Sequence, residues 1–247
     1  MFFFSKKEFL IDQFTDGLID IHNHLLPGLD DGSTSMDTTV EMIELMKACN
    51  ITNAYVTPHI MEDFYELNTQ LIGDRFAQVQ IDIENNYSQH KGFMIDHASE
   101  YMIDSQFETL LEHRDIKCLF NNYLLCELSY FQKPINLEDI LFKMISYGYQ
   151  PILAHPERYR YLKEEEFIEL HKKGFKFQLN LLSLSGFYGS DARQKALYLL
   201  ENQRYSFVGT DAHKAKHLMS LKDIQLVKKS IKFFEPVLEE HLSTFTV

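Results

Sequence analysis

Two histidines that stand two positions apart follow a short apolar stretch near the start of the sequence. Residues 18–21 are mostly apolar and lead into His22 and His24, and the loop that follows contains Asp30 and Asp31. Side chains two residues apart on a strand point to the same side, so both imidazoles can reach one point. This pattern indicates the mouth of a metal site. Asp30 and Asp31 are equally compatible with a simple turn or with contact to that site.

Further potential ligands stand at the ends of most of the other predicted strands. In a parallel barrel the carboxyl ends of the strands form one face, and active sites lie on that face. Such a number of nitrogen and oxygen ligands exceeds what one ion needs, so we expect two or three ions, with Glu100 or Glu127 as a bridge. The absence of a thiolate from the set favours catalytic Mn, Fe or Zn over a structural zinc. The eight candidates are His22, His24, His59, Glu100, Glu127, His155, Asp211 and His213.

The remaining histidines lie on predicted helices or loops and lack partners at ligand spacing. We expect them to be structural, although one of them, His217, stands close to His213. These residues are His90, His97, His113, His171, His217 and His241.

The elements that position these residues alternate between strand and helix. Apolar periodicity predicts strands over residues 18–22, 53–57, 92–102, 123–128, 151–154, 175–181 and 205–208. It predicts helices over residues 36–49, 67–87, 107–114, 135–147, 164–173 and 191–202, and one or two more within 218–245. Seven strands that alternate with helices predict an α/β fold with a parallel sheet, and 247 residues suit a closed or nearly closed barrel in a single domain.

Composition limits the partners and the compartment. The net charge of −12 argues against binding to nucleic acid or to an anionic membrane surface. No apolar run is long enough for a membrane-spanning helix, so we do not expect membrane insertion. Cys49, Cys118 and Cys126 form no CxxC pair, which predicts reduced core residues in a cytoplasmic protein. The apolar residues Phe2–Phe4 are expected to pack under the barrel or in a subunit contact, and a homo-oligomer remains open.

The motifs resemble a known superfamily. They are DIHNHLLPGLDDGS at 20–33, TPH at 57–59, Glu100 in SEYM, Glu127 in CELSY, AHPERY at 154–159 and GTDAH at 209–213. This set resembles the PHP (polymerase and histidinol phosphatase) superfamily, and within it the bacterial capsule-type protein-tyrosine phosphatases. The resemblance implies one PHP-type metallophosphatase domain over 1–247, with residues 1–17 as an N-terminal extension. It implies a distorted TIM-like (β/α)7 barrel and a site for three ions, commonly manganese, with iron, cobalt or zinc as alternatives.

The resemblance also implies a reaction and roles for particular residues. The reaction is hydrolysis of phosphotyrosine on a bacterial tyrosine kinase, or a related protein, of polysaccharide export. The eight candidates named above match the metal ligands, and Arg158 matches an arginine that contacts the substrate phosphate. Asp211 and His213 are expected to assist catalysis. The segment after His59 has no second histidine, so the ligands of the third ion stay open.

Elementary chemistry favours water as the nucleophile. Bound metal ions lower the pKa of water to about 7, so we expect attack by a metal-bound hydroxide without a phosphoenzyme. A thiolate mechanism needs an arginine six positions after the cysteine, and those positions hold Tyr55, Leu124 and Gln132. Arg158, as a planar donor, can hold two phosphate oxygens.

Three alternatives remain at this point. Arg158 could form a surface salt bridge with Glu157 or with residues 164–166. The enzyme could act on a small phosphomonoester such as histidinol phosphate. The chain could also be a metal-stabilised scaffold without activity, although structural metal sites usually lack open positions.

Overall fold

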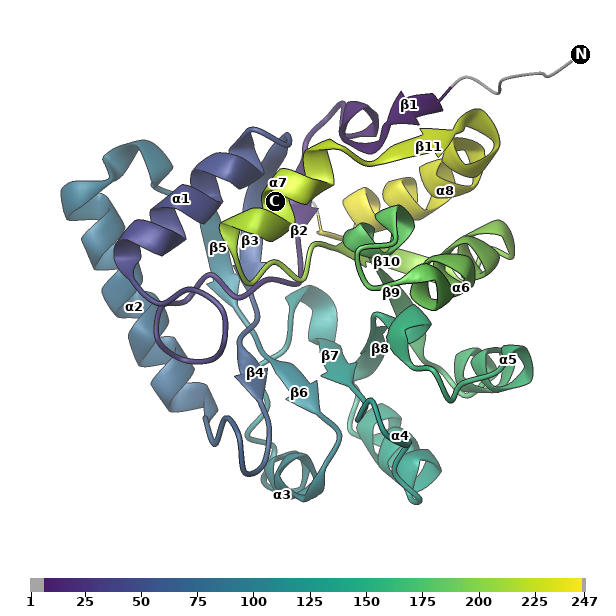
Figure 1. Cartoon of the computed structure of the whole chain (residues 1–247). Coiled ribbons are helices and arrows are strands. Elements are labelled where there is room, and N and C mark those ends of the chain that lie inside the picture. Colours follow the sequence, from purple (N-terminus) through teal and green to yellow (C-terminus); the bar gives the residue numbers. More distant parts are fainter. Residues whose placement is uncertain (1–6, 246–247) are drawn as a thin grey trace, which may run out of the picture.

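Short parallel strands form the centre of the fold, and helices surround them (Figure 1). The computed structural model describes residues 7–245. The central strands, in chain order, are β2 (Leu18–Asp20), β3 (Ile51–Val56), β4 (His59–Ile60), β5 (Met94–His97), β6 (Glu100–Met102), β7 (Tyr123–Glu127), β8 (Gln150–Ala154), β9 (Lys176–Asn180) and β10 (Tyr205–Gly209).

The strands follow one another in the order of a seven-stranded barrel, but their pairing is interrupted. One sheet has the order β2-β3-β5 and the other the order β10-β9-β8-β7-β6-β4. The predicted strands 53–57 and 92–102 each divide in two, because β3 and β5 lie in the first sheet and β4 and β6 in the second. Pro58, which has no backbone N–H to donate, marks one of these breaks. An isolated parallel bridge between Asn23 and Ala212 links the two sheets near β2 and β10. The α/β architecture is therefore a distorted TIM-like (β/α)7 barrel, and no continuous closed ladder is found among residues 7–245.

The helices agree closely with the sequence prediction. The first six begin and end within two residues of the expected positions. Side-chain caps explain several starts: Ser35 accepts from Thr38 N, Asn68 from Leu71 N and Asp104 from Phe107 N. The helices are α1 (Met36–Lys47), α2 (Thr69–Asn86), α3 (Ser105–His113), α4 (Leu137–Ser146), α5 (Glu164–Lys172), α6 (Ser190–Glu201), α7 (Ala215–Lys222) and α8 (Lys228–Phe245).

Two short strands that the sequence did not predict join the ends of the described chain. β1 (Lys7–Phe9) pairs antiparallel with β11 (Gln225–Val227), which separates α7 from α8. Part of the predicted N-terminal extension is therefore attached to the C-terminal region. Phe2–Phe4, for which we expected packing under the barrel or a subunit contact, lie outside the described residues.

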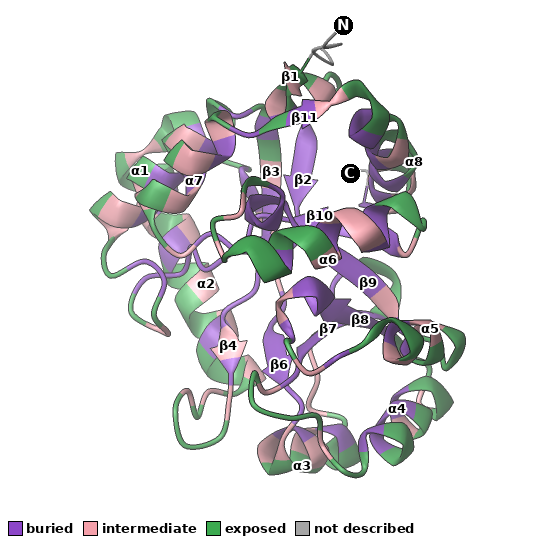
Figure 2. Ribbon diagram, turned by 45° about the vertical axis from the view of Figure 1, so that its right-hand side comes forward, coloured by how far each residue is buried: buried purple, intermediate pink, exposed green. Residues whose placement is uncertain are grey.

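Alternate strand residues face two different apolar clusters. Leu124 packs with the surrounding helices, while its neighbour Leu125 lies in a separate cluster with Ile152 and Phe207. The ring of Phe245, at the end of α8, joins this second cluster, with its centroid 5.1 Å from that of Phe207. Figure 2 shows the result, with buried strands inside and exposed outer faces on the helices. Among residues 7–245, no helix combines the length and the apolar character needed to cross a lipid bilayer.

Candidate metal centre

All eight predicted ligand residues come together where the strands end or break. His22 and His24 follow β2, His59 begins β4, Glu100 begins β6, Glu127 ends β7, His155 follows β8, and Asp211 and His213 follow β10. Six of them are buried, and only His59 and His213 are partly exposed, at 12% and 13% of their side-chain surface. The fold thus gathers at one place residues that are spread over nearly 200 positions of sequence.

Two of these residues have a left-handed backbone. His155 has φ 34° and Asp211 has φ 50°, a region that costs a residue other than glycine about 1–3 kcal/mol. His155 directly follows the buried strand β8, and Asp211 lies two residues beyond the buried strand β10. The packed strand therefore holds each side chain in an orientation that the free backbone disfavours.

His22, His24, Glu100 and Asp211 form the most enclosed ligand group. His22 Nε2 lies 3.0 Å from Glu100 Oε2 and 3.4 Å from Asp211 Oδ1. His24 Nε2 lies 3.6 Å and 3.3 Å from the same two oxygens. Ligand bonds of about 2.0–2.2 Å at octahedral or tetrahedral angles place neighbouring ligand atoms about 2.8–3.6 Å apart. The four atoms therefore have the spacing that one small divalent cation requires.

Glu100 also belongs to a second group, with His59 and Glu127. His59 Nδ1 lies 3.1 Å from Glu100 Oε2 and 3.0 Å from Glu127 Oε1. His155 Nε2 adjoins this group at 2.9 Å from Glu100 Oε1. The Glu100 carboxylate thus lies between two ligand groups, which is the position of a bridging ligand.

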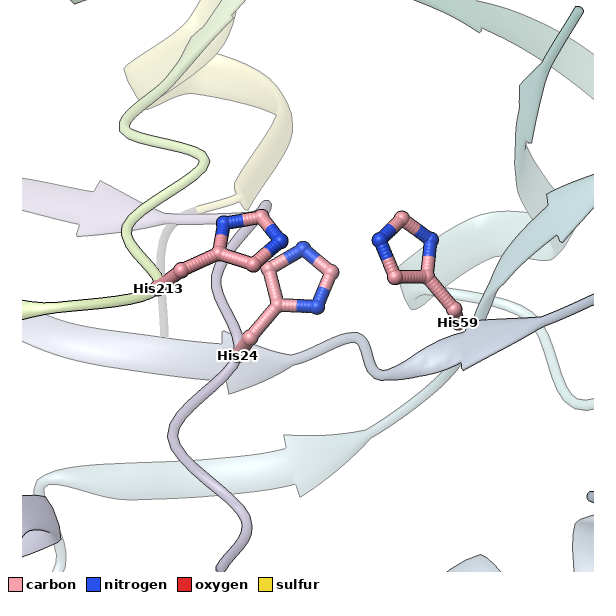
Figure 3. A group of neighbouring side chains, drawn as sticks. All are labelled: His24, His59 and His213. Carbon is pink, nitrogen blue, oxygen red and sulfur yellow. The ribbon is translucent and has the colours of Figure 1, made fainter. Parts of the chain in front are cut away.

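His24, His59 and His213 form a third group at the mouth of the site (Figure 3). The rings come from three separate segments, and the centroid of His24 lies 3.8 Å from that of His213 and 4.5 Å from that of His59. Asp31 Oδ1 approaches His213 Nε2 at 3.4 Å and His59 Nε2 at 3.7 Å. The sequence left Asp31 open between a turn and the site, and the structure places it at the site.

The unsatisfied polar atoms of the site indicate that a cation fits there. Buried polar atoms in proteins are almost always hydrogen-bonded. Here a set of converging nitrogens and carboxylate oxygens has no hydrogen-bond partner among the described residues, and their lone pairs suit a cation. These atoms are His22 Nε2, His24 Nε2, His59 Nδ1, Glu100 Oε2 and Glu127 Oε1.

Three imidazoles are oriented by hydrogen bonds on the ring nitrogen that faces away from the group. His22 Nδ1 donates to Gln178 Oε1 at 2.9 Å, and Gln178 Nε2 in turn donates to Leu179 O. His24 Nδ1 donates to Asp30 Oδ2 at 2.7 Å, and His213 Nδ1 to the backbone oxygen of Asp211. When the imidazole is neutral, as a metal ligand must be, each bond selects the tautomer that leaves Nε2 free to bind a metal.

Sequence reasoning missed the polar residues of β9. Gln178 orients His22, and Asn180 Nδ2 donates to Asp211 Oδ2 at 3.0 Å. Both are fully buried. The available signal was polar residues at alternate positions of the strand, Lys176, Gln178 and Asn180, with apolar residues between them, which places these side chains on one face.

The charges of the ligand-free site depend strongly on one another. Burial by itself lowers the pKa of His24, but the carboxylates of Asp30 and Asp211 together outweigh burial and raise this pKa to about 10. Burial raises the pKa of Asp30, but His24, His59 and the backbone N–H of Gly32 together outweigh burial and lower this pKa to about 2. Glu100 is buried as well, yet its histidine neighbours hold its pKa well below the usual range. Carboxylates packed in this way need positive charge nearby, and a divalent cation supplies it.

Arg158 lies beside the ligand groups and does not form the surface salt bridge considered above. Its Nη1 donates to Asp211 Oδ2 at 2.6 Å. Its guanidinium lies 4.2 Å from the Tyr188 ring centroid and 4.9 Å from that of Tyr130. Glu157 is occupied elsewhere, because its carboxylate accepts hydrogen bonds from other groups, Ser183 Oγ among them. Arg158 therefore faces the site and borders a cavity of about 630 Å³.

Neither His217 nor His241 belongs to a ligand group among the described residues. His217 Nδ1 accepts from His213 N at 3.3 Å, so it supports the site from behind. His241 on α8 is fully buried; its Nε2 donates to Ile19 O and its Nδ1 accepts from Val208 N. A structural role, as the sequence predicted, agrees with both arrangements.

The chain is similar to characterised proteins over most of its length. YwqE of Bacillus subtilis, a tyrosine-protein phosphatase, is 29% identical over 203 residues, which are 81% of this chain and 78% of YwqE. CpsB of Streptococcus agalactiae, also a tyrosine-protein phosphatase, is 26% identical over 204 residues, which are 79% of this chain and 83% of CpsB.

A solved structure from a study of YwqE and of CpsB from Streptococcus pneumoniae, described as unique metal-dependent tyrosine phosphatases, has a TM-score of 0.74 at 24% identity. The match covers 91% of this chain and 95% of that one, which confirms the fold. The model of the family described as "Capsular polysaccharide synthesis, CpsB/CapC" matches residues 18–229, a span that includes every ligand candidate and Arg158. The chain therefore belongs to the CpsB/CapC family.

Proposed function

We propose that this protein is a metal-dependent phosphatase that hydrolyses phosphotyrosine in a bacterial tyrosine kinase or a related protein of polysaccharide export. The observation that carries the proposal is the convergence of five unsatisfied, buried ligand atoms beside a fixed arginine. The similarity of this chain to the tyrosine-protein phosphatases YwqE and CpsB supports the reaction. Three free cysteines, two of them buried, support a reducing compartment such as the cytoplasm.

The ligand groups suit more than one divalent ion, and we propose manganese. The residues that would hold the ions are the eight candidates, with Glu100 as a bridge and with Asp31 added to His59 and His213. Asp31 supplies a carboxylate where the sequence left the third ion's ligands open. Imidazole and carboxylate ligands without a thiolate suit Mn, and also Fe, Co or Zn. When bound, such ions activate water for attack and offset the negative charge of the phosphoryl group.

Arg158 is placed to bind the phosphate of the substrate. Asp211 holds one of its nitrogens, and the rings of Tyr130 and Tyr188 lie near the guanidinium. The nitrogens that Asp211 does not hold remain for phosphate oxygens, in the planar arrangement that suits two such bonds. The guanidinium thus needs little reorganisation when charge builds up on the phosphoryl group.

The cysteines are unsuited to act as nucleophiles. Burial raises the pKa of the Cys49 thiol to about 11 and that of Cys118 to about 12. It raises the pKa of the fully buried Cys126 well above the usual value. All three therefore stay protonated at neutral pH, whereas nucleophilic cysteines react as thiolates. This agrees with water as the attacking group.

Asp211 and His213 have separate proposed roles in the reaction. Asp211 contacts both His22 and Arg158, so it joins the ligand groups to the phosphate-binding arginine. The side chain of His213 is partly exposed, at 13% of its surface, and lies beside Asp31, so a leaving group can approach it. A tyrosine leaving group has a pKa of about 10, so it needs only modest help from a proton donor at this position.

The test compares two substrate classes. The purified protein is assayed with a phosphotyrosine peptide and with histidinol phosphate, each with and without a chelator. We expect a kcat/KM for the peptide at least about tenfold higher, and loss of activity with chelator. A preference for histidinol phosphate would replace the proposed substrate, and activity that survives metal removal would contradict the proposed chemistry.

A further inference from the structure

A cleft extends outward from Arg158, away from the ligand groups. Its volume is about 630 Å³, and Arg158, Tyr130 and Tyr188 form its inner part. Phe131, Arg160 and the first residues of α6 form the rest of its lining. A phosphate bound at Arg158 would therefore have the remainder of its carrier molecule directed along this cleft.

Arg160 is an unusual residue in this position. It is exposed, and its guanidinium makes no hydrogen bond or ion pair with any residue between 7 and 245. Asp191 lines the same cleft, but its carboxylate lies 3.4 Å from Lys195 Nζ, which offsets its charge. In a chain with a net charge of −12, an unpaired arginine beside the site offers a positive charge to an acidic group.

The cleft also offers an apolar contact. The side chain of Phe131 is 92% exposed, and that of Tyr130 is 42% exposed. A peptide extended past these rings buries apolar surface, which favours binding. A free small phosphomonoester is too short to use both this contact and Arg160.

We propose that this cleft binds the polypeptide segment that flanks the phosphotyrosine, and that Arg160 selects substrates with an acidic residue in that segment. The inference rests on the proposed function and extends it from the phosphotyrosine to its neighbours. Arg158 binds the phosphate itself, whereas Arg160 acts only on the flanking charge. Replacement of Arg158 should therefore lower the rate on every substrate, whereas replacement of Arg160 should change only the preference between peptides.

The test is a charge reversal with matched substrates. The holoenzyme with Arg160→Glu is compared with the wild type on a phosphotyrosine peptide flanked by glutamates, the same peptide with lysines, and phenyl phosphate. We expect kcat/KM for the acidic peptide to fall about fivefold and that for the basic peptide to rise, mainly through KM. The rate on phenyl phosphate should stay unchanged, and Arg160→Gln should give an intermediate preference.

Arg75→Glu on α2 is the matched control, because Arg75 is also exposed and lies outside this cleft. It makes the same change in net charge and should leave the peptide preference unchanged. An equal effect of both variants, or no change of preference in Arg160→Glu, would overturn the inference. Hydrolysis of the peptides by the wild type tests the proposed function separately. A failure of the proposed function would therefore be detected before the variants are compared.

Discussion

Arg158 Nη1 lies 2.6 Å from Asp211 Oδ2, while the other oxygen of the same carboxylate, Oδ1, faces His22 and His24. One side chain therefore joins the arginine to the most enclosed ligand group. Asn180 also donates to Asp211 Oδ2, so the carboxylate keeps a partner if the arginine is removed. This arrangement makes substrate binding and metal binding experimentally separable.

Replacement of Arg158 by alanine should lower kcat by about 100-fold or more, because one preorganised charged donor is lost from the phosphate site. Metal content should stay near normal, since Asn180 still holds Asp211. Arg158→Lys should restore little activity, because a lysine lacks the planar pair of donors. Rates near those of the wild type in the alanine variant would show that Arg158 does not bind the phosphate.

Removal of the metal ions should abolish activity. Without them, no group activates the attacking water, and no positive charge offsets the negative charge of the phosphoryl group. Manganese should restore the rate best among the divalent ions. Mass spectrometry of the native protein should find about two to three ions per chain. A fully active protein that holds one ion or none would refute the assignment of the ligand groups.

Replacement of Asp30 by asparagine should weaken metal binding about 10–100-fold while the fold is kept. The asparagine has the same shape but lacks the charge that fixes the Nδ1 proton of His24. Calorimetric titration of the ligand-free protein with manganese measures the effect. Asp16→Asn, at an exposed position before β2, is the control and should bind normally. An unchanged affinity for manganese in the Asp30 variant would mean that residues other than Asp30 orient His24.

His241 should make the protein sensitive to acid. Burial lowers its pKa to about 4, whereas the unfolded chain has a value near 6.5. The unfolded state therefore binds the proton first, so the stability contribution is full above about pH 6.5 and is lost progressively towards about pH 4. The shift corresponds to about 3 kcal/mol of unfolding free energy.

Urea unfolding of the wild type and of His241→Gln, both in chelator, checks this prediction. The variant cannot titrate at this position, so the stability difference between the two proteins should shrink as the pH falls from 6.5 to 4. A difference that stays constant over this range would show that His241 is not held neutral by the fold.

The sequence by itself determined the alternation of strands and helices and the eight ligand candidates. Strand and helix periods are local properties, and a parallel arrangement places all strand ends on one face. His22 and His24 could be assigned to one point from their spacing alone. The same local logic found the helices, because caps such as Ser35 and Asn68 are encoded next to the segments that they start.

Only the tertiary structure decided how these residues divide into groups and what orients them. The break at Pro58 moves His59 into register with Glu100, and this pairing involves strands that are distant in sequence. The bonds from Gln178 to His22 and from Arg158 to Asp211 span 156 and 53 positions, so no local pattern encodes them. Periodicity predicts which side of a helix or strand a residue faces. The atoms that its side chain contacts depend on how the strands of the barrel pair with one another.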